Sequence, residues 1–147
     1  MINLHGKKAV IFGVATKLSI AYHIAKQLRK AGCELILGYQ ERAHDYVKPI
    51  AEELDAIMVE CDVVKPELVD SFFEEVKKQF GTFDYLVHSI AFAKKEHLKG
   101  KYFDVDLRGY SVAQEVSSYS LVMLTKKAYP LMKKEGSIIT MTYLGAD

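Results

Sequence analysis

The sequence predicts an α/β fold of the doubly wound type, with a parallel sheet between two layers of helices. Short β-branched runs alternate with longer segments of helical spacing along the 147 residues. No hairpin signal joins one apolar run directly to the next. Strands separated in this way pair in parallel through right-handed crossovers. We therefore expect one Rossmann-like domain over residues 1–147, with the strand order 3-2-1-4-5 and truncated after its fifth strand.

Short apolar runs that end at turn or polar residues indicate the strands. They cover residues 8–12, 34–39, 57–61, 83–87 and 137–141. Apolar residues that return every three or four positions indicate helices at 20–31, 45–54, 66–80 and 111–131. A long loop leads from the fourth strand to about Arg108.

Local signals support the first two helices. In the first, Ile20, Ile24 and Leu28 recur every four residues, and Gly32 follows as a C-terminal stop. The second helix contains Pro49, which has no amide proton to donate to the preceding turn. We therefore expect Pro49 to lie near the first turn of its helix.

The third helix has both a start signal and an apolar face. Pro66 opens it, at a position where the missing amide proton costs nothing. Leu68, Phe72, Val76 and Phe80 then form an apolar stripe of helical spacing. This spacing predicts a helix that packs against the sheet.

Composition excludes several classes of partner. The net charge is +1, and the densest basic stretch, residues 94–101, is interrupted by Glu96, so we expect neither nucleic acid nor a membrane as partner. Cys33 and Cys61 are too few for a disulfide framework and are not spaced as a metal pair. With no signal peptide and no membrane-spanning run, the sequence predicts a cytoplasmic protein with reduced thiols and no metal.

The loop after the first strand is a candidate phosphate-binding site. Ligands of open parallel sheets bind beyond the carboxyl ends of the strands, where the winding reverses. Gly13 would allow close approach of a phosphate, and Ser19 would cap the next helix or donate to a phosphate oxygen beside Ile20. The usual G-x-G-x-x-G pattern is absent, so a plain turn with a capping serine is an equal alternative.

The ends of the second and third strands supply candidate adenosine contacts. Gln40 is followed by Glu41, a carboxylate that would accept from a ribose hydroxyl, and by Arg42, which could accommodate a 2′-phosphate. Because Glu41 should repel that phosphate, we favour NADH over NADPH. Asp62 could accept from the adenine amino group while Val63 covers the ring; the ordinary role of Asp62 would be to cap the following helix, and the two roles are compatible.

The last two strands end in residues that suit a nicotinamide and a substrate. Ala91 and Ala93 are small enough to let a flat ring and an acyl chain lie near the backbone. His88 is a possible proton donor, but at an apolar strand end a packed, hydrogen-bonded histidine is the stronger expectation. Tyr143 follows the fifth strand, and its phenol could bind a substrate oxygen.

Several of these stretches together resemble the bacterial enoyl-acyl carrier protein reductases of the FabI type, within the short-chain dehydrogenase/reductase superfamily. The matching stretches are Gly13 to Tyr22, Tyr39-Gln40, Cys61-Asp62-Val63, His88 to Ala93, Ser117 to Ser120, and Tyr143 to Ala146. They agree in order and spacing along essentially the whole chain. Ala91 replaces the glycine of the most familiar members, a change that we expect to be tolerated.

The resemblance implies reduction of the trans-2 double bond of an acyl thioester on acyl carrier protein, with NADH, in fatty acid synthesis. It implies a homotetramer. It places Ala93 at the substrate and makes Tyr143 the first of two active-site tyrosines. The residues that it places at the cofactor are Gly13, Ser19, Ile20, Gln40, Asp62, Val63 and Ile90.

Members of this family continue with a second tyrosine and a lysine beyond the segment that matches Tyr143. We therefore expect this chain to be the N-terminal part of a longer reductase, and to be inactive if taken alone. Two alternatives are another short-chain dehydrogenase or ketoreductase, and a non-catalytic dinucleotide-binding fragment. Ketoreductases usually carry a T-G-x-x-x-G-x-G loop and an Asn-Ala-Gly after the fourth strand, which residues 12–20 and 88–91 lack.

Overall fold

The computed structural model describes residues 2–142 and shows a five-stranded, wholly parallel sheet. The strands are β1 (Lys8–Phe12), β2 (Glu34–Tyr39), β3 (Ile57–Glu60), β4 (Phe83–His88) and β5 (Met132–Thr140). Their order across the sheet is β3-β2-β1-β4-β5. This is the predicted doubly wound topology, so the expected fold class is confirmed.

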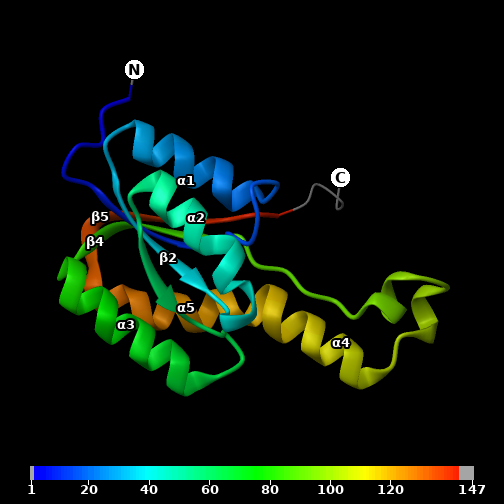
Figure 1. Ribbon diagram of the computed structural model, residues 1–147. Coiled ribbons are helices and arrows are strands. Elements are labelled where there is room, and N and C mark those ends of the chain that lie inside the picture. The colour runs from blue at the N-terminus through cyan, green and yellow to red at the C-terminus, as the bar shows by residue number, and fades with distance from the viewer. Residues whose placement is uncertain (1, 143–147) are drawn as a thin grey trace.

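Helices cover both faces of the sheet (Figure 1). The helices α1 (Ile20–Lys30) and α2 (His44–Leu54) lie on one face. On the other face lie α3 (Pro66–Phe80) and α5 (Ser120–Ala128), and α4 (Leu107–Gln114) precedes α5. Among the described residues, no helix has the length and apolarity needed to cross a bilayer.

Two hydrophobic clusters fill the space between the sheet and its helices. Phe12 and Phe72 are central to the cluster under α3 and α5, with ring centroids 4.8 Å apart. Ile11 and Leu37 belong to the cluster under α1 and α2. Neighbouring residues of β1 therefore point into different clusters, because successive side chains of a strand alternate between its faces. This explains why β1 is apolar almost throughout.

The buried face of α1 differs from the predicted one. Ile20 is 62% exposed, whereas Ala21, Tyr22 and Ala25 are buried. Ile24 is partly buried against the same cluster. Small alanines let the helix approach the sheet closely, so the larger residues at four-residue spacing lie at the edge of the contact. The stripe predicted for α3 is largely confirmed, with Val69 and Phe73 buried in addition.

Pro49 lies inside α2 instead of in its first turn. A short 3₁₀ turn, Glu41–Ala43, precedes α2, and the helix then begins at His44. Pro49 therefore removes one hydrogen bond from the helix interior. The helix forms nevertheless because Val47, Ile50, Ala51 and Leu54 are buried against the sheet, and this burial outweighs the local preference.

The single helix predicted over residues 111–131 is divided into three parts. It begins earlier, at Leu107, widens into a π-helix over Glu115–Tyr119, and resumes as α5. After α5, a 3₁₀ turn leads directly into β5, which starts at Met132 instead of residue 137. The extra residues of β5 are polar (Lys133 to Glu135) and exposed, so they carry no apolar alternation by which a strand could be recognised.

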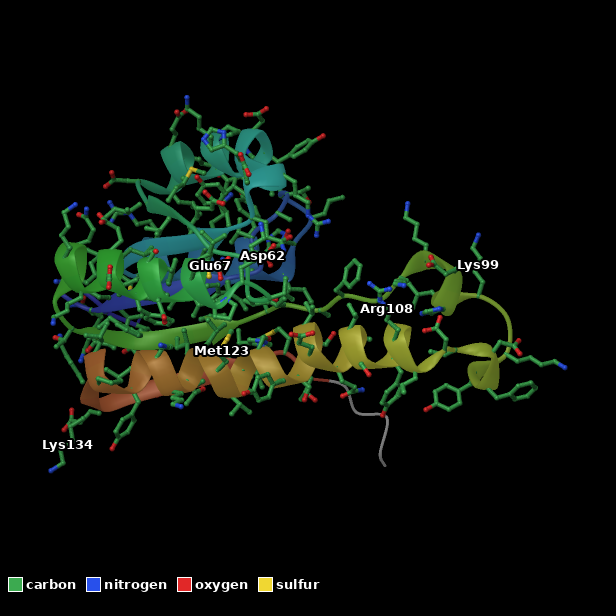
Figure 2. The ribbon with its side chains drawn as sticks, turned by 90° about the horizontal axis from the view of Figure 1, so that it is seen from below. Asp62, Glu67, Lys99, Arg108, Met123 and Lys134 are labelled. Atoms are coloured by element: carbon green, nitrogen blue, oxygen red, sulfur yellow. The ribbon has the colours of Figure 1, made fainter. Side chains whose placement is uncertain are left out.

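The long loop before α4 is confirmed, and it contains two short 3₁₀ turns. It extends away from the sheet together with α4, as the green-to-yellow segment of Figure 1 shows. Lys99 and Arg108 lie on this extension in Figure 2, far from Asp62. The loop is closed by His97, whose Nε2 lies 3.1 Å from Oδ2 of Asp106, the N-cap residue of α4.

Candidate functional site

A cavity of about 560 Å³ lies at the carboxyl edge of the sheet. It is lined by residues that follow each of β1, β2, β3 and β4. The winding reverses between β1 and β4, which are neighbours in the sheet, so the cavity occupies the position where such folds bind ligands. Five of the predicted site residues line it: Gly13, Gln40, Asp62, Val63 and Ile90.

Gly13 is required by its backbone and by its neighbour. Its φ is +107°, which L side chains rarely adopt, and a Cβ built there would lie only 2.0 Å from the carbonyl oxygen of Ser89. The glycine therefore lets the end of β1 contact the loop that follows β4. The sequence suggested close approach of a phosphate as the reason for this glycine, whereas the structure shows close approach of the protein's own backbone.

Ser19 organises the loop between β1 and α1. It occupies the N-cap position of α1, but its Oγ accepts from the amides of Ala15 and Thr16 in the preceding loop, at 3.1 and 2.9 Å. Thr16 Oγ1 accepts from the amide of Leu18 at 3.2 Å. Several loop amides are thus used within the loop itself. The groups best placed to receive an anion are the Ser19 hydroxyl proton and the first amides of α1, which helix geometry leaves unpaired.

Gln40, Glu41 and Arg42 all line the cavity beyond β2. Arg42 Nε donates to Oε1 of Gln40 at 2.9 Å, so the guanidinium and the amide form one polar surface. Glu41 brings a carboxylate to the same part of the lining. This end of the cavity therefore offers both hydrogen-bond donors and acceptors to a polar ligand.

Asp62 holds the turn after β3. Its Oδ1 accepts from the amide of Val64 at 3.3 Å, while its backbone oxygen accepts from the amide of Lys65 at 2.9 Å. The N-cap residue of α3 is Lys65. Helix capping, the alternative role for Asp62, is therefore wrong: the carboxylate stabilises the turn before the helix. Val63 is buried and forms an apolar part of the cavity wall next to this carboxylate.

The loop after β4 forms the part of the cavity wall next to the end of β1. Ser89 donates its amide to the carbonyl of Phe12 at 3.1 Å, and Ile90 packs against the core cluster under α3. Ala91 lines the cavity. Ala93, two residues further along the same loop, does not. Ser19 and Ile20 also lie outside the lining, at the start of α1.

His88 is a packed, hydrogen-bonded residue, as expected, and the structure identifies its partners. Its Nε2 lies 2.7 Å from Ser120 Oγ, and its Nδ1 lies 3.1 Å from Thr140 Oγ1. Ser120 donates its single hydroxyl proton to the carbonyl of Val116, so it must accept from His88. This assigns the proton to Nε2 and leaves Nδ1 as an acceptor for Thr140. Burial lowers the pKa of His88 and keeps the ring neutral.

The two cysteines are buried and free. Burial raises the pKa of Cys33 to about 11 and that of Cys61 to about 12. Both therefore remain protonated thiols that pack in the core, and neither is suited to act as a nucleophile. Tyr143, the predicted active-site tyrosine, lies outside the described residues.

Ser117 contacts the site, although sequence reasoning assigned it no role. Its hydroxyl accepts from the amide of Phe92 at 3.1 Å and lies 3.3 Å from the carbonyl of the same residue. Ser117 lies in the π-helix, a feature often found at functional sites. The stretch Ser117 to Ser120 matched a family motif, which was the one sequence signal that could have identified it.

Comparisons with known proteins identify the family of this chain. A sequence model described as "Enoyl-(Acyl carrier protein) reductase" matches residues 13–147. The chain is 44% identical over 146 residues to an "Enoyl-[acyl-carrier-protein] reductase [NADH] FabI" of Rickettsia bellii, covering 98% of this chain and 56% of that protein. A protein of the same name from Enterococcus faecalis is 45% identical over 145 residues, with 98% and 58% covered.

A solved structure shows the same likeness in three dimensions. The reductase of Anaplasma phagocytophilum, determined in complex with NAD, superposes with a TM-score of 0.94 at 40% identity. The match covers 100% of this chain and 58% of the other. The chain thus spans little more than half the length of these relatives. By sequence and by fold, the chain belongs to the enoyl-(acyl carrier protein) reductase family.

Proposed function

We propose that this chain is the dinucleotide-binding part of an NADH-dependent enoyl-acyl carrier protein reductase of fatty acid synthesis. The protein would reduce the trans-2 double bond of an acyl thioester carried on acyl carrier protein. The observation that carries the proposal is the cavity at the carboxyl edge of the sheet, to which β1, β2, β3 and β4 each contribute a residue expected at the cofactor. The named NADH reductases among its relatives support the same activity.

Residues of the cavity, together with the start of α1 outside its lining, suit the parts of the dinucleotide. Gln40 and Asp62 supply polar groups for the adenosine, and Val63 supplies an apolar surface for the adenine ring. The Ser19 hydroxyl and the first amides of α1, beginning at Ile20, would hold the diphosphate. Ile90 would border the nicotinamide, which supplies the hydride when the dinucleotide is bound.

Glu41 favours NADH over NADPH. Its carboxylate lines the cavity beside Gln40 and would repel a 2′-phosphate. The relatives named above are NADH reductases, in line with repulsion by Glu41. Arg42 could offset part of this repulsion through its terminal N–H groups, while its Nε donates to Gln40. The guanidinium thus supports the amide that we assign to the adenosine. We therefore place NADH as the preferred cofactor.

The substrate side of the site would involve Ala93 and Tyr143. We propose that Tyr143 hydrogen-bonds the thioester region of the substrate and that Ala93 borders the acyl chain. The coverage of 56–58% of the relatives supports the proposal that the domain over 1–147 is the N-terminal part of a longer enzyme. Ile138 and Ile139 of β5, 40% and 44% exposed, are apolar surfaces that further chain would cover.

We also propose that the full-length protein is a cytoplasmic homotetramer, as the family resemblance implies. Exposed apolar side chains from the π-helix to the 3₁₀ turn after α5 support an interface there: Tyr119, Val122 and Tyr129 are 61%, 60% and 78% exposed. Light scattering of the full-length protein after gel filtration would test the proposal, and a monomer at micromolar concentration would contradict it.

The activity is tested by NADH oxidation with crotonyl thioester in the full-length protein. The informative variant is Asp62→Ala, which removes a charged acceptor from the cavity and should weaken NADH binding about tenfold. Asp45→Ala is the matched control, because the Asp45 side chain is exposed on α2 and lies outside the cavity lining. Binding should be unchanged in this control.

Two results would contradict the proposed activity. Turnover of a β-ketoacyl thioester without turnover of the enoyl substrate would indicate a ketoreductase. NADH binding without turnover of either substrate would indicate a non-catalytic dinucleotide-binding protein. Equal NADH affinity in Asp62→Ala and the unmodified protein would show that the cavity is not the adenosine site.

A further inference from the structure

We propose that Ser117 is a positioning residue that holds the loop after β4 in the conformation that receives the nicotinamide ring. The inference rests on the proposed function, because it concerns the same dinucleotide. It goes further by assigning a role to a residue outside the cavity lining, on the π-helix between α4 and α5.

The contact between Ser117 and the loop has an unusual form. One hydroxyl accepts from the amide of Phe92 at 3.1 Å and donates to the carbonyl of the same residue at 3.3 Å. It therefore satisfies both backbone groups of a residue that is 39% exposed and lies in neither a helix nor a strand. A hydroxyl can do both at once because it carries one proton and two lone pairs.

This contact fixes one end of the segment that lines the cavity. The other end is held at Ser89, whose amide donates to the carbonyl of Phe12 at 3.1 Å. Only Ile90 and Ala91 lie between these two attachments, and both line the cavity. Because so short a segment is held at both ends, its backbone has little freedom before any ligand binds.

The π-helix brings a second serine to the same strand end. The amide of Ser120 donates to the carbonyl of Glu115, five residues back, so the carbonyl of Val116, four residues back, is left to accept from the Ser120 hydroxyl. Ser120 then accepts from His88 at the end of β4. Ser117 and Ser120 thus hold the chain at Phe92 and His88, on either side of Ile90 and Ala91.

Loss of the Ser117 hydroxyl should weaken the binding of the nicotinamide end of the dinucleotide and leave the binding of the adenosine end unchanged. The Phe92 amide and carbonyl would lose their partner, and Ile90 and Ala91 would sample other conformations. Binding would then have to order the loop again, at a cost in conformational entropy. The adenosine contacts at Gln40 and Asp62 come from other strands, so they should be unaffected.

The experiment compares two ligands in the full-length protein. NADH carries the nicotinamide, whereas ADP-ribose lacks it, so the pair separates the two ends of the site. Ser117→Ala should weaken NADH binding about threefold to tenfold and leave ADP-ribose affinity unchanged. Amide exchange measured without ligand should be faster in the peptide that contains Ile90 to Phe92. Ser118→Ala is the control, since Ser118 is exposed in the same π-helix.

A second pair of variants removes the effect of side-chain size. Ser117→Thr and Ser117→Val have nearly the same shape, but only the first keeps a hydroxyl. We expect NADH affinity to be restored in Ser117→Thr and to remain weak in Ser117→Val. This pair decides the question even if Ser117→Ala unfolds.

Three results would overturn the inference. Equal loss of NADH and ADP-ribose affinity would indicate a general structural role, as would equal behaviour of the threonine and valine variants. Unchanged NADH affinity in Ser117→Ala, with faster exchange of the loop, would show that the contact exists without positioning the cofactor. A fourth result, failure of the unmodified protein to bind NADH, would refute the proposed function itself, which distinguishes it from those three.

Discussion

Gly13 is the residue at which the site tolerates least change. A side chain there would meet both a positive φ of +107° and the carbonyl of Ser89 at 2.0 Å from the new Cβ. We expect Gly13→Ala to lower the free energy of unfolding by about 3 kcal/mol. Chemical denaturation would measure it. Gly6→Ala is the control, since Gly6 has φ +75° but open space, and should cost about 1 kcal/mol. Equal costs would show that the contact with Ser89 is unimportant.

The burial of His88 predicts how the free energy of unfolding depends on pH. Burial lowers the pKa of His88 in the folded protein, so on acidification the unfolded chain takes up this proton first. Its contribution to stability is therefore full above the ordinary histidine pKa of about 6.5. We expect the free energy of unfolding to fall as pH drops below that value, by at most about 1.4 kcal/mol per pH unit from this residue.

Two measurements check the assignment of His88. Denaturation at a series of pH values gives the slope, and nitrogen NMR reports which ring nitrogen carries the proton. The hydrogen bonds to Ser120 and Thr140 require the proton on Nε2 at neutral pH. A charged ring, or a proton on Nδ1, would contradict the hydrogen-bond network.

At the scale of the elements, Asp84 joins the beginnings of three strands. Its carboxylate, 3% exposed, accepts from Lys7 Nζ before β1, from the Lys8 amide, and from Lys133 Nζ of β5. Burial alone would raise the pKa of Asp84, but these hydrogen bonds outweigh burial and lower it. The carboxylate is therefore charged at neutral pH and stabilises the edge of the sheet opposite the cavity.

Asp84→Asn should lower the free energy of unfolding by about 2 kcal/mol, because the buried side chain loses its charge-assisted hydrogen bonds, while the Lys7 and Lys133 side chains, 41% and 42% exposed, stay hydrated. The control is Asp70→Asn, since Asp70 is 54% exposed and pairs with Lys127 on the surface; its loss should cost at most about 1 kcal/mol. Because the folded pKa of Asp84 is depressed, this stabilisation is full above pH 4 and is lost as pH falls through the folded pKa. A similar cost for both variants in chemical denaturation would contradict a special role for Asp84.

At the scale of the whole molecule, the proposed cofactor should act on stability as well as on activity. A ligand that binds only the folded state adds about 2.7 kcal/mol at one hundred times its dissociation constant. We expect NADH to stabilise the full-length protein by this amount in chemical denaturation. At equal concentration, NADPH should stabilise the full-length protein less than NADH does. Glu41→Ala should reduce this difference between the two nucleotides. Equal stabilisation by both nucleotides in the unmodified protein would contradict the role given to Glu41.

The sequence by itself determined the architecture and the position of the site. Alternating strands and helices led to the parallel sheet, and the residues just past each strand included five that line the cavity. These features are local, because the spacing of nearby apolar side chains along the sequence indicates a strand or the buried face of a helix. The buried face of α3 was predictable for this reason.

Only the tertiary structure decided which partners these residues meet. Nothing in the sequence places Ser89 against Gly13, Ser120 against His88, or Ser117 against Phe92, because these contacts join segments distant in the chain. The π-helix was equally hidden, since a five-residue segment is too short to show a periodicity of its own in the sequence. Hydrogen bonding across the core, together with close packing, selects these arrangements after the elements have come together.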